Sequence, residues 1–205
     1  MAAPTQSIST VASIMAAAKS LFLAKNYAEV TMDRIAEKSD LTKGALYHHF
    51  SSKEELYLEM MHADLAQKRE IFTAAIDSSE DCRERLRQLT KAFFDLPPEK
   101  RELIKLVQRD INVFRDPARA NLVRAYQQSL PELVERVIRD GIENGKLAPG
   151  DPRLLSWHFV SMVQVTLDLY ADSLFDDSDQ KLDYVLNLFF DGAVAAKQAR
   201  RGVTP

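Results

Sequence analysis

Glycine and proline are scarce in this chain, and their positions leave long stretches in which nothing interrupts a helix. Residues 45–96 contain neither residue type, and the whole 205-residue sequence holds six glycines and eight prolines. Turn-rich β folds need glycine and proline at frequent intervals, so this spacing favours helices. We therefore predict an all-α protein of about nine helices, with ample length to enclose a core.

Apolar periodicity and the breaks between periodic segments set the expected helix boundaries. The fourth helix should be the longest, with Ser51 or Ser52 at its start, because both serines have a glutamate three residues later. Pro117 and Pro152 suit the first turn of a helix, and Gly145 suits a C-terminal cap. The predicted helices span residues 9–25, 31–38, 43–50, 52–77, 81–95, 99–114, 117–144, 152–175 and 179–199.

Composition limits the classes of protein to which the chain can belong. The formal net charge is −3, so any binding to nucleic acid has to come from a local basic surface. The single cysteine, Cys82, excludes an internal disulfide and suits a reducing compartment. The N-terminus lacks a signal-peptide pattern, and the chain has no apolar run long enough to span a bilayer. We expect a soluble, cytoplasmic protein.

A glycine lies two residues into the helix predicted at 43–50, within the sequence TKGALYHHF. It shares one helix face with Lys43, Tyr47 and His48. Glycine removes a side chain where the backbone of a bulky partner could approach closely, and its three neighbours can donate to phosphate oxygens. Lysine can also reach the edges of bases. The alternative is that Gly44 is incidental and that its neighbours are ordinary surface residues.

The opposite face of the same helix carries Leu46 and Phe50, so it has to pack against the helix predicted at 31–38. Two short helices joined by a tight turn, of which the second presents a polar face, form a helix-turn-helix. This arrangement predicts double-stranded DNA as a partner.

The sequence around this helix, VTMDRIAEKSDLTKGALYHHFSSKEEL, resembles the DNA-binding region of the TetR family of transcriptional regulators. The resemblance lies in the Ile-Ala pair, Leu-Thr-Lys-Gly, Leu-Tyr, His-Phe and Ser-Lys-Glu-Glu-Leu, and upstream in IMAAAKSLFLAKNYAEVT. Two places depart from the family pattern. Ser39 and Asp40 stand where many members have alanine-glycine, and residues 1–18 carry no charged side chain where a basic residue is usual.

This resemblance implies a DNA-binding domain at residues 1–56 and an effector-binding and dimerisation domain at 57–205, with no catalytic activity. The protein would be a homodimeric repressor of a pseudo-palindromic operator, and a small, largely apolar effector would modulate its operator affinity. The implied phosphate contacts are Thr31, Thr42, Tyr47, His48 and Lys53, and the implied major-groove contacts are Lys43, Gly44 and Ala45.

The C-terminal helices have broad apolar surfaces. The segment SWHFVSMVQVTLDLY, residues 156–170, is apolar nearly all round, which predicts burial on more than one side. The last predicted helix carries an apolar stripe from Leu182 to Phe190, followed by small residues at 192–196. In the family the final two helices form the dimer interface. Surface this apolar would aggregate if it were left exposed on a monomer, so a homodimer is expected.

Aromatic residues of the same region, with a few polar neighbours, are candidates for an effector pocket. Aromatic residues at helical spacing are more often core than the wall of a pocket, and His158 also fits a hydrogen-bonded core or interface histidine. The candidates are Phe93, Phe94, Gln108, Arg109, Phe114, Tyr126, Trp157, His158 and Met162.

Two other classes of protein remain as alternatives. An enzyme finds little support, because GIENGK at 141–146 lacks the spacing and the Ser/Thr of a phosphate loop. Histidine and cysteine do not cluster with metal-ligand spacing, so we expect neither a metal nor a cofactor. The second alternative is a helical protein that binds small molecules or partners without binding DNA.

Overall fold

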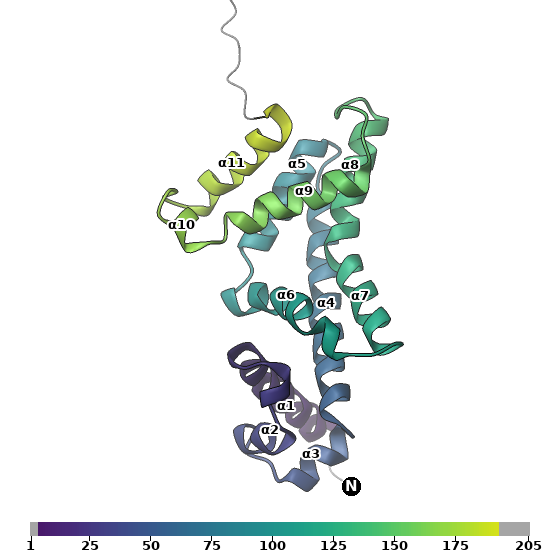
Figure 1. Cartoon of the computed structure of the whole chain (residues 1–205), viewed down its shortest axis with the longest axis vertical. Coiled ribbons are helices and arrows are strands. Elements are labelled where there is room, and N and C mark those ends of the chain that lie inside the picture. The colour runs from purple at the N-terminus through teal and green to yellow at the C-terminus, as the bar shows by residue number, and fades with distance from the viewer. Residues whose placement is uncertain (1–3, 193–205) are drawn as a thin grey trace, which may run out of the picture. The chain divides into compact units, whose positions relative to one another are not determined.

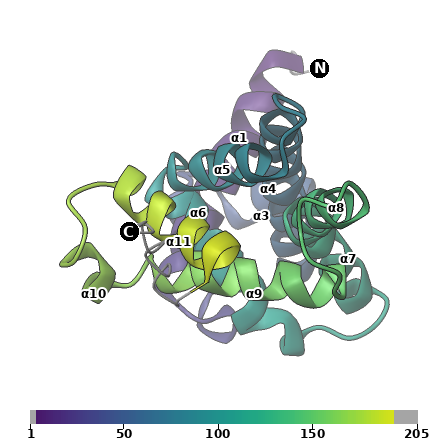
Figure 2. The same ribbon diagram turned by 90° about the horizontal axis from the view of Figure 1, so that it is seen from above.

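The computed structural model describes residues 4–192, with side chains from Thr10 onward. Every regular element in that range is helical, as predicted (Figures 1 and 2). The α-helices are α1 (Pro4–Ala24), α2 (Met32–Lys38), α3 (Lys43–His49), α4 (Lys53–Ile76), α5 (Cys82–Phe94), α6 (Pro98–Asp110), α7 (Ala118–Ser129), α8 (Pro131–Glu143), α9 (Pro152–Val165), α10 (Leu169–Asp172) and α11 (Ser178–Asp191). Two short 3₁₀ helices are η1 (Tyr27–Glu29) and η2 (Ile111–Val113). The last predicted helix, 179–199, includes small residues at 193–196, and these lie outside the described range.

Residues 4–192 form eleven α-helices rather than about nine, because two of the predicted helices are interrupted. The helix predicted at 117–144 breaks before Pro131, where the preceding residue has a φ of −143°. Proline has no N–H for the helical ladder and disfavours the α conformation in the residue before it. The helix predicted at 152–175 ends at Val165, and Asp168 then caps the short helix α10.

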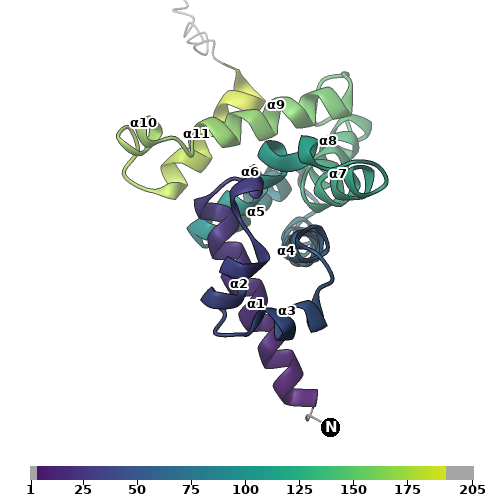
Figure 3. The same ribbon diagram turned by 60° about the horizontal axis from the view of Figure 1, so that its bottom comes forward.

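The helices divide into two compact units, of which the first contains α1 to α3, most of α4, α6, η2 and α7. Figure 3 shows α2 and α3 beside α1. Four aromatic rings form the centre of this unit, with the buried Tyr57 ring 4.8 Å from Phe22 and 5.2 Å from both Tyr27 and Phe114. Such ring contacts stabilise a core beyond their burial alone. They join the end of α1 to α4 and so support the short helices α2 and α3.

The second unit contains α5, most of α8, α9, α10 and α11. Helix α11 packs against both α5 and α9 (Figure 2). Its apolar stripe was expected to form part of a dimer interface, but most of it packs within this unit, with Leu182, Val185 and Leu186 each 1% exposed. Polar contacts edge the seam with α5: Arg83 donates to the side-chain oxygen of Asn187 at 2.5 Å, and Arg87 pairs with Asp183 on α11.

These packing units do not coincide with the predicted functional division at 1–56 and 57–205, because α6 and α7 pack with the N-terminal helices. The units are defined by contacts between residues, whereas the predicted domains are defined by the partner that each would bind. The functional division therefore stays a prediction.

Candidate nucleic-acid interface

Two threonines begin the two helices of the predicted helix-turn-helix. The Thr31 hydroxyl oxygen accepts a hydrogen bond from the amide of Arg34 at 3.3 Å, and that of Thr42 accepts from the amide of Ala45 at 3.2 Å. Each threonine is thus an N-cap that satisfies a free amide in the first helical turn. A capping hydroxyl keeps its own proton to donate, so both exposed side chains can also bond a phosphate oxygen.

The turn between α2 and α3 closes tightly without an alanine-glycine pair. Asp40 has a φ of 56°, in the left-handed region that aspartate tolerates better than most residues. The buried Ser39 hydroxyl donates to the carbonyl of Ile35 at 2.8 Å, and the amide of Leu41 donates to the carbonyl of Ala36 at 2.9 Å. These bonds complete the end of α2, so Ser39 and Asp40 form the turn that the family pattern requires.

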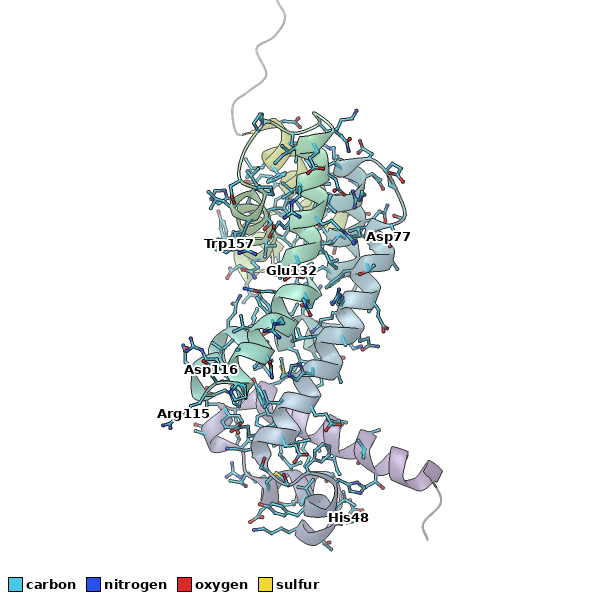
Figure 4. All side chains as sticks on the ribbon, turned by 90° about the vertical axis from the view of Figure 1, so that its right-hand side faces the viewer. His48, Asp77, Arg115, Asp116, Glu132 and Trp157 are labelled. Carbon is cyan, nitrogen blue, oxygen red and sulfur yellow. The ribbon has the colours of Figure 1, made fainter. Side chains whose placement is uncertain are left out.

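Helix α3 has one buried and one exposed face, as its sequence predicts. Leu46 is fully buried and Phe50, directly after the helix, is 2% exposed. A Cβ added to Gly44 would meet no atom within 4 Å, so packing within the chain does not require glycine there. Figure 4 labels His48 at this helix. The exposed residues are Lys43, Gly44, Tyr47 and His48, and Ala45 is half-buried.

The Lys43 ammonium is not free in this structure. Its Nζ lies 2.7 Å from a carboxylate oxygen of Asp33 on α2, and both side chains are more than half exposed. The hydrogen bond from Lys43 to Asp33, together with the attraction between the two charges, raises the pKa of Lys43. Sequence analysis missed this partner, because Asp33 and Lys43 come together only through the angle between α2 and α3.

Lys53 has a larger structural role than its predicted phosphate contact implies. Its ammonium donates to the carbonyl oxygens of Tyr27 and Val30, both at 2.8 Å, and lies 4.2 Å from the centre of the Tyr27 ring. Partial burial lowers the pKa of Lys53. An ammonium has three protons, so one remains for a phosphate. Lys53 thus ties the start of α4 to the segment before α2.

The first turn of α4 is capped by the predicted pattern of serine and glutamate. The amide of Glu55 donates to the Ser52 hydroxyl at 3.0 Å, which makes Ser52 the N-cap. The carboxylate of Glu55 accepts from the amide of Ser51 at 2.7 Å and from the Ser51 hydroxyl. These hydrogen bonds lower the pKa of Glu55. The cap fixes where α4 begins, directly after α3.

Four residues predicted to bind an effector lie in the first unit and already make contacts within the chain. Phe114 is buried in the aromatic cluster. The Gln108 side chain donates to the Tyr126 hydroxyl at 3.3 Å. Arg109 donates to two carbonyl oxygens at the end of α1, at 3.0 and 3.1 Å. Phe114 therefore serves as core, and Arg109 fastens α6 to α1.

A hydrogen-bonded chain of side chains runs from α4 through α6 to α1. Asp110, only 3% exposed, accepts from the Tyr57 hydroxyl at 3.1 Å and from the neighbouring Arg109 guanidinium at 2.7 Å. Burial, and then the negative charge of Asp110, raises the pKa of Tyr57, so the phenol stays a proton donor. We name Tyr57, Arg109 and Asp110 the α4–α6 latch. The sequence did not predict it, because the contact between Tyr57 and Asp110 is tertiary.

The other effector candidates lie in the second unit, on two different kinds of surface. Phe93 and Phe94 are 5% and 7% exposed and belong to the buried face of α5. On α9, Trp157 is 56% exposed, His158 is exposed and Met162 is half-buried. The segment expected to be buried on more than one side is thus exposed along one side, since the described residues leave Trp157 more than half exposed.

Open grooves flank α1 in the first unit. One of about 480 Å³ lies between α1, α4 and α6, and its walls include Met15, Met60 and Leu103. Another of about 420 Å³ has Arg109 in its wall, together with Leu23. Arg109 is therefore both a predicted effector contact and a residue with a groove beside it.

Two further kinds of site are absent from the described residues. Across residues 4–192, no helix combines the length and apolar character needed to cross a membrane. The same part of the chain brings together no three histidine, cysteine, aspartate or glutamate side chains that could hold a metal ion.

Comparison with known protein families gives two matches along the chain. Residues 14–60 match bacterial regulatory proteins of the tetR family, and residues 79–171 match the tetracyclin repressor-like C-terminal domain. The first match contains α2, the turn and α3, which carry the exposed polar face. Together the two matches extend over more than half of the chain.

Individual relatives agree with these matches. The HTH-type transcriptional regulator YhgD of Bacillus subtilis is 26% identical over 163 residues, which are 80% of this chain and 81% of that protein. The HTH-type transcriptional activator FasR of Mycolicibacterium smegmatis is 29% identical over 131 residues, 63% of this chain and 60% of FasR. A solved structure of a candidate fatty acid metabolism regulator from Clostridium perfringens superposes with a TM-score of 0.75 at 27% identity, covering 90% of this chain and 100% of that one.

Proposed function

The chain belongs to the TetR family of transcriptional regulators, and we propose that it represses transcription as a homodimer bound to a pseudo-palindromic operator, until a small, largely apolar effector lowers its operator affinity. The observation that carries the proposal is the exposed face of α3, in which hydrogen-bond donors surround a glycine with open space beside it. Family members are regulators rather than enzymes.

On this proposal α3 enters the major groove of DNA. Lys43, Gly44 and Ala45, in the first turn, are the residues nearest the base edges, and Lys43 can donate to guanine acceptors. Tyr47 and His48 follow on the same face and donate to phosphate oxygens. Thr31, Thr42 and the remaining proton of Lys53 complete the phosphate contacts. The capping bonds of both threonines hold their hydroxyl groups at the helix starts, where backbone amides also favour a phosphate.

The proposed dimer surface lies on the second unit. Large apolar side chains of α9, α10 and the segment after α10 are exposed in the single chain, with Val165 at 72%, Leu169 at 84% and Tyr170 at 71% (Figure 4 labels Trp157 on α9). Monomeric soluble proteins rarely expose so many neighbouring apolar side chains. A two-fold dimer presents two identical α3 helices, and an inverted repeat in DNA mirrors that symmetry.

The α4–α6 latch supports the proposed regulation. Tyr57 lies one turn after Lys53 on α4, so the latch joins α6 and α1 to the helix that starts at the DNA interface. A movement of α6 would change the position of α4 and α1 through these bonds. We take the protein to exchange between two arrangements of these helices, of which one binds the operator more tightly. An effector shifts this equilibrium only by the difference between its affinities for the two arrangements, typically about 1–3 kcal/mol, or roughly 5–150-fold in operator affinity.

The descriptions of two relatives bear on the chemistry of the effector and on the sense of regulation. The similar structure from Clostridium perfringens is described as a candidate fatty acid metabolism regulator, which agrees with an apolar effector. The nine candidate residues named from the sequence stay proposed contacts, and Phe114 also packs in the aromatic cluster. FasR is an activator by its name, so the relatives include a protein with the opposite direction of regulation. We propose repression because repression relieved by a ligand is the usual behaviour of the family.

Selection of bound duplexes from a random DNA pool tests the proposed function. The purified protein should enrich an inverted repeat whose half-sites lie about one helical turn, or a multiple of it, apart. Absence of any enriched repeat would contradict sequence-specific regulation.

Thermal-shift screening with apolar compounds, including fatty acids and acyl thioesters, tests the effector. Compounds that raise the melting temperature should weaken binding to the selected operator. Stabilising compounds that leave operator affinity unchanged would contradict the proposed coupling.

A further inference from the structure

We propose that Asp33, in the first turn of α2, is a specificity-determining residue, which orients Lys43 toward a base edge and weakens binding to DNA of unrelated sequence. The inference rests on the proposed DNA binding and adds to it a residue that no motif or relative assigns. It starts from an unexpected feature of the interface: a carboxylate lies on the surface that has to face phosphates.

Asp33 lies in the first turn of α2, where a carboxylate stabilises a helix, but that role does not require its pairing with Lys43. The hydroxyl of Thr31 already caps this helix by accepting from the amide of Arg34. The Asp33 carboxylate instead accepts from the Lys43 ammonium at 2.7 Å, and the side chains of the pair are 64% and 61% exposed. Ion pairs this exposed contribute little to folding. A pair of so little value for folding, placed beside Gly44, is better explained by what it does when DNA arrives.

The pair constrains the reading of bases by Lys43. A free lysine side chain is flexible and binds any phosphate within reach as a point charge. With one proton donated to Asp33, the ammonium has two protons left, which match neighbouring acceptors such as O6 and N7 of guanine. A matching base pair therefore gains a lysine that is already oriented. Asp33 acts here as a positioning residue, because its contact to DNA runs through Lys43.

The same carboxylate disfavours binding to unrelated DNA. Affinity for unrelated sequence comes from cations that replace the counterions of phosphates. Lys43 paired with Asp33 is a poor cation for this purpose, since the charges of the pair cancel. Breaking the pair to reach a phosphate leaves the Asp33 carboxylate facing the DNA backbone. Asp33 thus lowers the competing affinity more than the affinity for the operator.

Substitution of Asp33 by asparagine tests the inference against a matched control. Glu37→Gln removes the same charge from an exposed position one turn later on the same face of α2. Dissociation constants for the selected operator and for a shuffled duplex are measured across a salt series for wild type and both variants. Asp33→Asn should raise affinity for the shuffled duplex about 3–10-fold at low salt, and steepen the salt dependence of log K by about one unit. The ratio of operator affinity to shuffled-duplex affinity should therefore fall.

The control and a double variant separate the inference from simpler explanations. Glu37→Gln should change the ratio of operator affinity to shuffled-duplex affinity by less than half as much as Asp33→Asn does. In a protein that already carries Lys43→Ala, adding Asp33→Asn should change this ratio little. Equal effects of the two single variants, or an unchanged ratio for Asp33→Asn, would overturn the role of Asp33. A wild-type protein that binds both duplexes equally would overturn the proposed function itself, and so the two failures are distinguishable.

Discussion

Two exposed surfaces of this chain, on α3 and on α9 with α10, differ in the chemistry that they offer a partner. On α3 the exposed side chains donate hydrogen bonds and lie around a glycine with open space beside it. On α9 and α10 the exposed side chains include five large apolar ones, Leu154, Trp157, Val165, Leu169 and Tyr170. The exposed fraction of these side chains does not distinguish the two surfaces, but their chemistry does. Donors beside open backbone suit a polyanion, and contiguous apolar area suits a second protein.

The largest effect should come from filling the open space on α3. Gly44→Leu places a branched side chain between the helix and the groove, so we expect operator affinity to fall by at least about 100-fold, a loss of some 2.7 kcal/mol or more. The fold should survive, because the new Cβ meets no atom within 4 Å. Titration of operator DNA and a thermal melt measure the two effects. Normal operator binding by Gly44→Leu would show that another surface faces the DNA.

A second large effect should follow from placing charge on the apolar surface. The double variant Val165→Glu/Leu169→Glu should raise the dimer dissociation constant about 100-fold or more, since burying each apolar side chain contributes about 1.5–3 kcal/mol and the two losses add. Analytical ultracentrifugation measures the change. Val113→Glu is the matched control, because Val113 is also exposed, at 53%, but lies on η2. Equal behaviour of the control and the double variant would place the dimer surface elsewhere.

The two glycines Gly44 and Gly141 should respond in opposite ways to alanine. A Cβ at Gly141 would lie 2.7 Å from the sulfur of Cys82, so Gly141→Ala should destabilise the fold by about 1–3 kcal/mol through overpacking. Gly44→Ala meets open space and should stabilise the fold by about 0.5–1 kcal/mol. Urea denaturation measures both. Destabilisation by Gly44→Ala would mean that glycine is needed there for folding rather than for a partner.

The smallest expected effect concerns the cap of α4 and depends on pH. Hydrogen bonds from Ser51 hold the pKa of Glu55 below its ordinary value of 4.5. A group whose pKa is lowered by folding stabilises the fold above its unfolded pKa, and this contribution is lost as pH falls through the folded pKa. Wild type should therefore lose stability relative to Glu55→Gln as pH drops from about 5 toward 3. Glu54→Gln, in the same turn, is the control. If the melting temperatures of wild type and Glu55→Gln fall in parallel as pH drops, the proposed role of Glu55 in the cap is contradicted.

The part of the structure that depends on local chemistry was predictable from the sequence. Helix α3, its N-cap Thr42 and its buried face all follow from the spacing of residues within ten positions. The left-handed turn at Asp40 also follows, because it depends on the intrinsic preference of one residue. These features need no knowledge of the rest of the chain.

The parts that depend on distant contacts were not predictable in the same way. Asp33 reaches Lys43, and Tyr57 reaches Asp110, only after the helices have packed. Aromatic character, which marks most of the apolar effector candidates, cannot distinguish the buried Phe114 from a pocket wall. Pro131 marks the break between α7 and α8 in the sequence itself, but the apolar periodicity that predicts a single helix continues through it.

A base-by-base comparison of wild type and Lys43→Ala on the selected operator tests most directly whether α3 reads the DNA. Each base pair of one half-site is substituted in turn, with the symmetric change in the other half-site, and affinity is measured for both proteins. Loss of one bidentate contact is worth about 1–3 kcal/mol of discrimination at a single position. We predict that Lys43→Ala loses the preference at one symmetric pair of positions and keeps it at the others. An equal loss of affinity for every substituted operator, with the pattern of preference unchanged, would contradict the assignment of Lys43 and the exposed face of α3 to base reading.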